Sequence, residues 1–242
     1  MAGIGLGRKS WIGKLPGIEW SNPLSSGLVL CVLGNRLPLY DIVGNRLFTQ
    51  TGNPKLNTPT TFGPGIETLV YNQGGYFSLP ASDPLRVQPP ATIGWAGYQA
   101  AVSTQHGLIV GIEHNNSNSS PYQSLTLQTG TTYYVHASND GTTIQEMVGS
   151  IKTTATLGRR VLVGVRGLST SALWVDGVRE GLLTYSGSIA YGATAQVGVA
   201  AQFTSGRDSG TVMSVIAVWN RELSLADISA FNANPTQMVK VG

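Results

Sequence analysis

The stretch Val161-Leu-Val-Gly-Val-Arg-Gly-Leu-Ser-Thr-Ser-Ala-Leu-Trp-Val-Asp-Gly177 decides the fold class, because it contains two short apolar runs and a turn signal. Val161, Val163 and Val165 alternate with Leu162 and Gly164. The run Ala172–Val175 continues directly into Asp176-Gly177. An Asp-Gly pair after such a run is a strong hairpin signal, since a type I′ turn needs positive φ at both central residues. The stretch therefore predicts antiparallel strands.

Similar apolar runs recur from Gly27 onward, separated by residues that favour turns. We predict further strands at Leu28–Leu33, Ala91–Tyr98, Leu108–Ile112, Ser124–Leu127, Tyr133–His136, Gln196–Val199 and Val212–Trp219. Roughly a dozen short strands with turn residues every 8–12 positions are typical of a two-sheet sandwich. Three indole rings sit within predicted strands, and we expect them to fill the gap between the sheets: Trp95, Trp174 and Trp219.

One short helix is predicted close to the C-terminus. Ser224-Leu-Ala-Asp227 has the spacing of a capping box, with Asp in place of the usual Glu. Ile228 and Phe231 fall on one face of this helix, and Asn234-Pro235 ends it. We expect the helix to pack against the sandwich in a structural role and not to carry a catalytic site.

The composition excludes several classes of protein. The chain has 242 residues, of which 11% are charged, whereas an average globular chain carries about 25%. Disordered and coiled-coil proteins need more charge, so both are excluded. Apolar runs such as Leu28–Leu33 are far shorter than the ~20 residues of a membrane helix. Basic residues cluster no further than the pairs Arg8-Lys9 and Arg159-Arg160, so we expect no nucleic-acid partner.

The single cysteine, Cys31, lies in an apolar run and permits no internal disulfide, so we expect a small buried side chain. The first residues have no basic segment ahead of an apolar block, unlike a secretory signal. We therefore expect synthesis in the cytoplasm.

Residues 1–20 differ from the rest because glycines alternate with basic residues and no acidic residue precedes Glu19. We predict that residues 1–20 form a flexible basic arm and that residues 21–242 form one sandwich domain. Two interpretations of the arm stay open. It is either a free terminus or a docking arm that orders on a partner protein, with contacts from Arg8, Lys9, Trp11 and Lys14.

Six segments between Ile18 and Pro235 carry a pattern of aromatic, Gly, Pro and Asp residues: Ile18–Val29, Leu39–Asn45, Gly63–Pro80, Thr92–Trp95, Leu173–Val178 and Val218–Ser224. In this order they resemble the concanavalin A-like, laminin G-type jelly roll found in virion proteins of tailed bacteriophages. The resemblance implies an all-β, two-sheet antiparallel jelly-roll sandwich with one short C-terminal helix and an extended N-terminal arm.

Calcium-binding members of that family resemble one another in a pair of acidic ligands, one on the strand before the Trp-Asn-Arg segment. Here that strand, Thr211–Ala217, has no carboxylate, although calcium usually takes two or more. Asp41 and Asp208 are the remaining contributors to a weak site. We expect neither a bound metal nor a cofactor.

We predict that the chain is not an enzyme. Glycosidases use two carboxylates about 5–10 Å apart, and jelly-roll endoglucanases resemble one another in a Glu-x-Asp-x-x-Glu strand. No such run occurs, and acidic residues such as Glu67 and Glu146 stand singly. His106 lies near Glu113-His114 in the sequence, but adjacent strand residues face opposite sides. The remaining alternative is a carboxylate pair that only the fold assembles.

Glycan binding is a second interpretation, because lectins share this fold. Sugar rings stack on exposed aromatic side chains, and polar groups bind their hydroxyls. The candidates are Tyr122, Tyr133, Tyr185 and Tyr191. The alternative is that these are ordinary edge and turn tyrosines.

The resemblance, the poorly charged surface and the basic arm together favour a structural role. We predict a virion structural protein, a capsid cement or decoration protein that docks on the major capsid protein or other virion proteins. It would form a homo-oligomer, be made in the host cytoplasm and reside in the virion. The alternative is a carbohydrate-binding tail or host-recognition protein that contacts a surface glycan.

Overall fold

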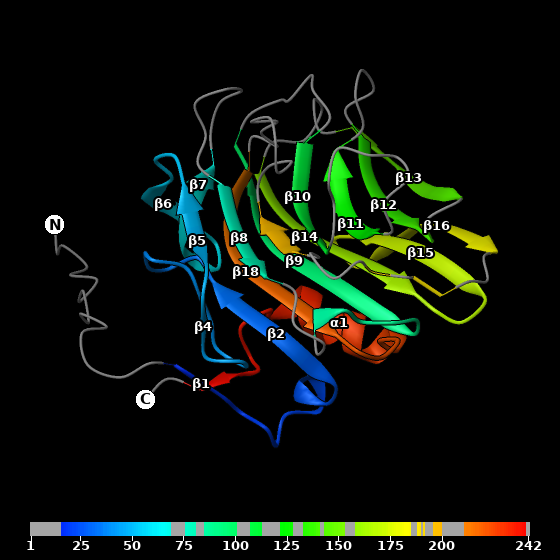
Figure 1. Cartoon of the computed structure of the whole chain (residues 1–242), viewed down its shortest axis with the longest axis horizontal. Coiled ribbons are helices and arrows are strands. Elements are labelled where there is room, and N and C mark those ends of the chain that lie inside the picture. The colour runs from blue at the N-terminus through cyan, green and yellow to red at the C-terminus, as the bar shows by residue number, and fades with distance from the viewer. Residues whose placement is uncertain are drawn as a thin grey trace, which may run out of the picture.

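The computed structural model of the chain describes residues 16–68, 76–80, 85–100, 107–112, 122–127, 133–140, 143–152, 158–184, 188–189, 191, 196–199 and 211–240. Within them, two large antiparallel sheets face one another, and one α-helix lies outside them (Figure 1). The prediction of an all-β jelly-roll sandwich with one short helix is confirmed. No helix in this part of the chain is long and apolar enough to span a membrane.

The larger sheet contains ten strands among the described residues. Its order is β16 (Val178–Thr184), β15 (Thr170–Val175), β14 (Gly158–Arg166), β9 (Ala91–Gln99), β18 (Thr211–Trp219), β2 (Leu28–Leu33), β3 (Tyr40–Asp41) and β4 (Arg46–Leu47). The hairpin of β6 (Lys55–Thr60) and β7 (Gly63–Thr68) joins this sheet, because β7 pairs with β18.

The smaller sheet contains seven strands among the same residues. Its order is β13 (Ile144–Lys152), β12 (Tyr133–Asn139), β11 (Tyr122–Leu127), β10 (Gly107–Ile112), β17 (Gln196–Val199), β8 (Tyr76–Pro80) and β5 (Thr49–Thr51). A separate ribbon pairs β1 (Gly17–Ile18) with β19 (Val239–Lys240). Residues 1–15 of the predicted arm lie outside the described residues.

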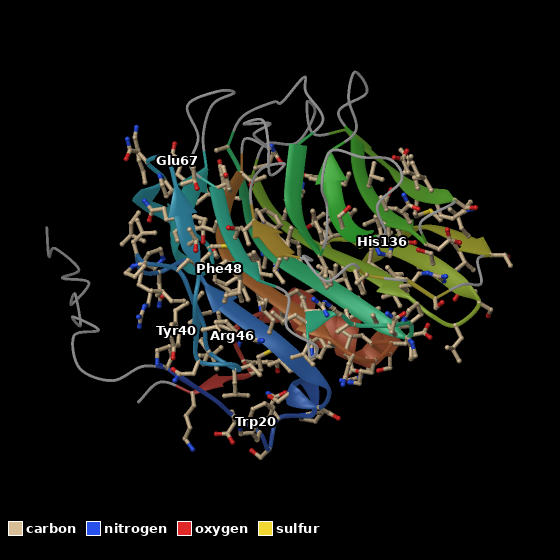
Figure 2. The ribbon with its side chains drawn as sticks, viewed as in Figure 1. Trp20, Tyr40, Arg46, Phe48, Glu67 and His136 are labelled. Atoms are coloured by element: carbon tan, nitrogen blue, oxygen red, sulfur yellow. The ribbon has the colours of Figure 1, made fainter. Side chains whose placement is uncertain are left out.

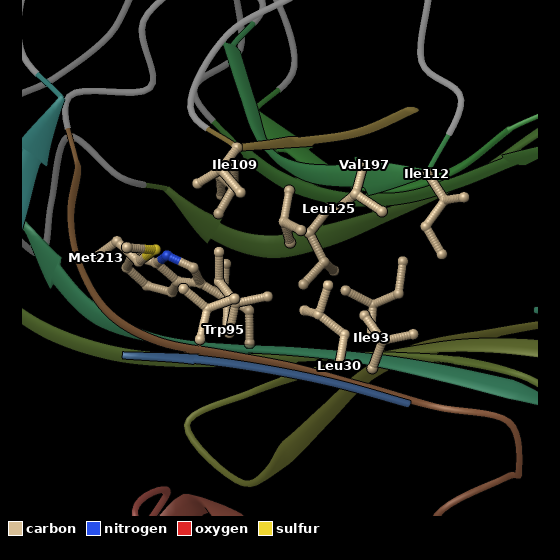
Figure 3. Close-up of a cluster of buried hydrophobic side chains, with 14 of the residues drawn as sticks. Leu30, Ile93, Trp95, Ile109, Ile112, Leu125, Val197 and Met213 are labelled. Atoms are coloured by element: carbon tan, nitrogen blue, oxygen red, sulfur yellow. The ribbon is translucent and has the colours of Figure 1, made fainter. Parts of the chain in front are cut away.

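A hydrophobic core fills the space between the two sheets (Figure 3). Side chains from both sheets interdigitate there, and each is at most 1% exposed: Leu30, Ile93, Trp95 and Met213 from the larger sheet, and Ile109, Ile112, Leu125 and Val197 from the smaller one. Full burial of a large apolar side chain contributes about 1.5–3 kcal/mol. This core therefore holds the two sheets together.

A second apolar layer covers the outer face of the larger sheet, where helix α1 (Leu225–Ala233) packs. The rings of Trp219 and Phe231 meet edge to face, with centroids 5.4 Å apart. Trp174 lies on the same outer face. The expectation that three indoles fill the gap between the sheets is therefore correct for Trp95 and wrong for Trp219 and Trp174. Strand alternation points the latter two away from the smaller sheet.

Arg221 joins the first and last segments of the domain. Its Nε donates to the carbonyl oxygen of Ser26 at 2.7 Å, and its Nη1 donates to the Asp227 carboxylate at 2.8 Å. Asp227 also accepts hydrogen bonds from the backbone and hydroxyl of Ser224, which confirms the predicted capping box. Beside it, Trp219 Nε1 donates to the Leu24 carbonyl at 2.6 Å, in the 3-10 turn Pro23–Ser25.

The predicted hairpin turn is present between β15 and β16. Asp176 and Gly177 both have positive φ, 51° and 83°, as a type I′ turn requires. The Asp176 carboxylate accepts a hydrogen bond from the backbone N–H of Val161 at 2.8 Å. The turn is thereby attached to the neighbouring strand β14.

His136 is a buried polar side chain between the sheets. It extends from β12 to β14, where its ring lies so close to Gly164 that a Cβ there would come within 2.5 Å of it. Its Nδ1 lies 3.1 Å from the hydroxyl of Ser171 on β15. Burial, aided by the positive charge of Arg166, lowers the pKa of His136 to about 3. The imidazole is therefore neutral in the folded protein.

We predict that Arg221→Ala lowers the free energy of unfolding by about 1–3 kcal/mol, because its charge-assisted hydrogen bonds to Ser26 and Asp227, at a partly exposed site, are lost. Urea denaturation would measure the loss. Arg221→Lys keeps the charge without the planar fork, so an intermediate loss is expected. Lys55→Ala, at an exposed side chain on β6, is the control and should change stability by less than about 0.5 kcal/mol. If Arg221→Ala has the same unfolding midpoint as the unaltered protein, these contacts of Arg221 do not stabilise the fold.

We also predict that His136 makes the fold acid-sensitive. Its folded pKa of about 3 lies below the ordinary value of 6.5, so the unfolded chain binds the extra proton first as the pH falls. Stability should decline below about pH 6.5 by about 1.4 kcal/mol per pH unit until about pH 3. His136→Gln should unfold in urea with a shallower pH dependence between pH 7 and 4. Equal slopes in the two proteins would contradict this assignment.

Candidate functional site

The edge of the larger sheet carries a groove on its outer face, between strands β14–β16 and the start of α1. Strand alternation sends Leu173 and Val175 into the core between the sheets, while Ala172 and Trp174 face outward. The segment before α1 forms the opposite wall. We call this cavity of about 320 Å³ the Trp174 groove; it is lined by Val165, Thr170, Ala172, Trp174, Arg179, Leu182, Glu222, Leu223, Ser224, Leu225 and Ile228.

One end of the groove combines an aromatic ring with a cation. Trp174 is half-buried, and the Arg179 guanidinium lies 5.9 Å from its ring centroid. That distance is within the range of a cation–π interaction. The β15–β16 register places the two residues opposite one another. Arg179 itself is exposed and lines the groove.

The other end of the groove presents oxygen atoms. Glu222 is exposed, and its Oε2 lies 2.9 Å from where a Cβ on Gly167 would stand; the Thr170 hydroxyl lies 3.0 Å from the same point. Because Gly167 has no side chain, the Glu222 carboxylate and the Thr170 hydroxyl can both lie in the space beside it. Thr170 and Trp174 are four residues apart on β15, which corresponds to roughly 13 Å.

Two leucines form the rim of the groove. Leu182 on β16 is 52% exposed and Leu225 at the start of α1 is 62% exposed. Apolar side chains at this exposure leave surface that a ligand can remove from water. The groove thus has an apolar rim, an indole and opposite charges at its two ends.

The tyrosines proposed from the sequence do not line this groove where they are described. Tyr191 is half-buried and packs against the core between the sheets. The backbones of Tyr122 and Tyr133 belong to β11 and β12 in the smaller sheet. Their side chains, and all of Tyr185, lie outside the described residues. So do the docking-arm candidates Arg8, Lys9, Trp11 and Lys14.

Sequence reasoning missed the groove residues for a specific reason. Trp174 lies in an apolar run, and such a run does not reveal which side of the sheet each residue faces. Arg179 and Glu222 are 43 positions apart in the sequence, and only the packing of α1 brings them to one cavity. One part of the site could have been predicted. A two-residue Asp176-Gly177 turn fixes the register of the hairpin, and that register pairs Trp174 with Arg179.

Asp41, a candidate calcium ligand, is fully buried and already bound. Its Oδ1 accepts hydrogen bonds from the backbone N–H groups of Cys31 and Val43 at 3.0 and 3.1 Å. Its Oδ2 accepts from Arg46 Nε at 2.8 Å and Nη2 at 2.6 Å, and from the backbone N–H of Gly44 at 3.0 Å. The carboxylate therefore anchors the β3–β4 turn. Asp208 lies outside the described residues.

The described residues hold no cluster of three or more His, Cys, Asp or Glu side chains that could bind a metal ion. Glu67 belongs to the larger sheet and Glu146 to the smaller one. Cys31 is fully buried, as predicted, and burial raises the pKa of its thiol. A buried, protonated thiol is a poor nucleophile. His106, Glu113 and His114 lie outside the described part of the chain.

No protein-family model matches the sequence, and no curated protein matches it significantly. The fold is similar to Domain 4 of AbnA, a GH43 extracellular arabinanase from Geobacillus stearothermophilus, in complex with arabinotriose. The TM-score is 0.66 at 15% identity, over 85% of this chain and 98% of that one.

The fold is also similar to two larger binding domains. One is the binding domain of botulinum neurotoxin DC in complex with SialylT, with a TM-score of 0.63 at 12% identity over 87% of this chain. The other is that of Paraclostridial Mosquitocidal Protein 1, with a TM-score of 0.62 at 12% identity over 86% of this chain. The chain spans about half the length of each, 52% in both cases. These similarities establish a shared β-sandwich fold.

Proposed function

We propose that the chain is a carbohydrate-binding domain that recognises a short oligosaccharide in the Trp174 groove without altering it chemically. The observation that carries the proposal is the combination of a half-buried indole with a cation and a carboxylate in one groove. A sugar has apolar C–H faces and hydroxyls at its rim. It therefore needs an aromatic surface together with donors and acceptors, which is what this groove contains.

Each group has a distinct task in this binding mode. The indole of Trp174 receives the apolar face of one sugar ring. Arg179 donates hydrogen bonds to hydroxyl oxygens beside that ring, while Glu222 and Thr170 accept hydrogen bonds from hydroxyls further along. Because the two ends are roughly 13 Å apart along β15, the groove suits more than one sugar ring.

The similar folds support this proposal over capsid decoration. The arabinanase domain, which this chain matches over almost its entire length, is a complex with arabinotriose. One of the similar neurotoxin binding domains is a complex with SialylT. Capsid decoration remains a prediction that involves the basic arm of residues 1–20, of which residues 1–15 lie outside the described residues. A host-recognition protein of a virus is one setting in which a carbohydrate-binding domain of this kind would act.

Glycan binding can be tested in two steps. A glycan array identifies a ligand, and calorimetric titration of the soluble oligosaccharide then gives its affinity. We predict that Trp174→Ala weakens binding about tenfold or more, because the stacking surface is lost. Arg179→Ala should weaken binding less, since only hydrogen bonds at a solvent-exposed rim are removed.

Tyr40→Ala is the matched control for this experiment. Tyr40 is also half-buried beside an arginine, with the Arg36 guanidinium 5.2 Å from its ring centroid. It lies on β3, near the opposite edge of the larger sheet from β15 and β16 (Figure 2). Binding equal to that of the unaltered protein is expected for this variant. The proposal is wrong if Trp174→Ala binds the oligosaccharide with unchanged affinity, or if the unaltered protein binds no glycan saturably.

A further inference from the structure

Among the described residues, Arg179 is a cation without an anionic partner. Its guanidinium makes no ion pair or hydrogen bond with them and lies 5.9 Å from the centroid of the Trp174 ring. By contrast, Arg46, Arg160 and Arg221 each bind a carboxylate of the same chain. The charge of Arg179 is therefore available to a ligand in the Trp174 groove.

The acidic residues that neighbour Arg179 in the sequence are directed elsewhere. Glu180 follows it, but the Cγ of Glu180 lies 3.6 Å from where a Cβ on Gly149 would stand, on β13 of the smaller sheet. Its side chain is thus turned toward the inside of the sandwich and does not line the groove. Asp176, in the hairpin turn, is held by hydrogen bonds to β14. The Trp174 end of the groove is therefore positively charged.

Glu222 is the one carboxylate among the described residues that line the groove, and it lies at the other end, beside Thr170. Thr170 and Trp174 are roughly 13 Å apart along β15. At physiological ionic strength, exposed charges are screened over about 8 Å. An anion beside Arg179 is therefore attracted by the near cation more strongly than it is repelled by Glu222.

The shape of the guanidinium indicates which anion fits. Two parallel N–H donors of an arginine match the two oxygens of a carboxylate, at N–O distances of about 2.8 Å. Because the guanidinium lies 5.9 Å from the ring centroid of Trp174, a ligand that stacks on the indole reaches Arg179 with a group close to its stacked ring. A sugar ring that carries a carboxylate one bond away combines the two features. Uronic acids and sialic acids have this structure.

We propose that the Trp174 groove selects an acidic oligosaccharide, in which a carboxylated sugar ring stacks on Trp174 and its carboxylate pairs with Arg179. This inference rests on the proposed carbohydrate-binding function and names the class of sugar. In a neutral oligosaccharide a hydroxyl takes the place of the carboxylate, so that its contact with Arg179 lacks the ionic attraction. Glu222 and Thr170 accept hydrogen bonds from hydroxyls of a further ring in both cases.

Calorimetric titration of the full chain with matched pairs of ligands tests this selectivity. One pair is trigalacturonate and its methyl ester, which keeps the shape but loses the charge; the other is sialyllactose and lactose. We expect the acidic member of at least one pair to bind about three- to tenfold more tightly at low salt. The pair that shows the difference identifies the source of the carboxylate. The difference should shrink at high salt, because salt screens exposed charges.

Substitutions of Arg179 identify the cation responsible. Arg179→Gln should remove the preference for the acidic ligand, and Arg179→Lys should keep part of it, because the charge remains without the planar fork. Arg36→Gln is the matched control. Arg36 also lies beside an aromatic ring, that of Tyr40, and has no anionic partner among the described residues, but it does not line the groove. Its loss removes the same unit of charge and should leave the preference unchanged.

The possible outcomes separate this inference from the carbohydrate-binding function. If the unaltered protein binds the acidic and neutral members of both pairs with equal affinity, the groove binds sugars but does not select acidic ones. A preference that persists in Arg179→Gln would show that another group binds the carboxylate, and would overturn the proposed ion pair. If neither these four ligands nor any other glycan binds saturably, both proposals are wrong.

Discussion

The guanidinium of Arg221 is the contact on which the outer layer of this domain depends. It binds the carbonyl oxygen of Ser26 near the start of the described chain and the carboxylate of Asp227 in the first turn of α1. The helix is thereby fixed over the larger sheet, with Phe231 against Trp219. Residues 222–224 lie directly between Arg221 and the helix, so the contacts of Arg221 also fix one wall of the Trp174 groove. A structural contact and the groove proposed to bind sugars thus share one short segment.

The sequence predicts the strands of this fold best where apolar runs are continuous. Leu28–Leu33 and Gln196–Val199 have the predicted bounds, and the Asp-Gly turn and the helix cap are found where expected. Short polar strands such as β5 (Thr49–Thr51) carry no periodic signal, because both of their faces are exposed. They form because a neighbouring strand offers unpaired backbone groups, which is a property of the whole sheet.

The candidate site was less accessible to sequence reasoning than the fold. Strand alternation tells which residues share a face, but the direction of that face depends on the second sheet and on the helix. Trp95 and Trp174 look alike in the sequence, yet one fills the core and the other faces a groove. Polar residues had the same ambiguity: Asp41 is enclosed by five hydrogen bonds, whereas Glu222 is exposed.

The β1–β19 ribbon determines how the domain responds to tension. Gly17 pairs with Lys240 and Ile18 with Val239 in antiparallel register, so the chain leaves both strands at the same end of the ribbon. A load that draws these two ends apart opens the ribbon one residue pair at a time, as a zipper, instead of shearing its bonds together. The load then reaches the Trp219–Leu24 and Arg221–Ser26 hydrogen bonds, next to the ends of β18 and β2. We expect this ribbon to open at a lower force than the one that unfolds the sandwich core, because only two residue pairs hold it.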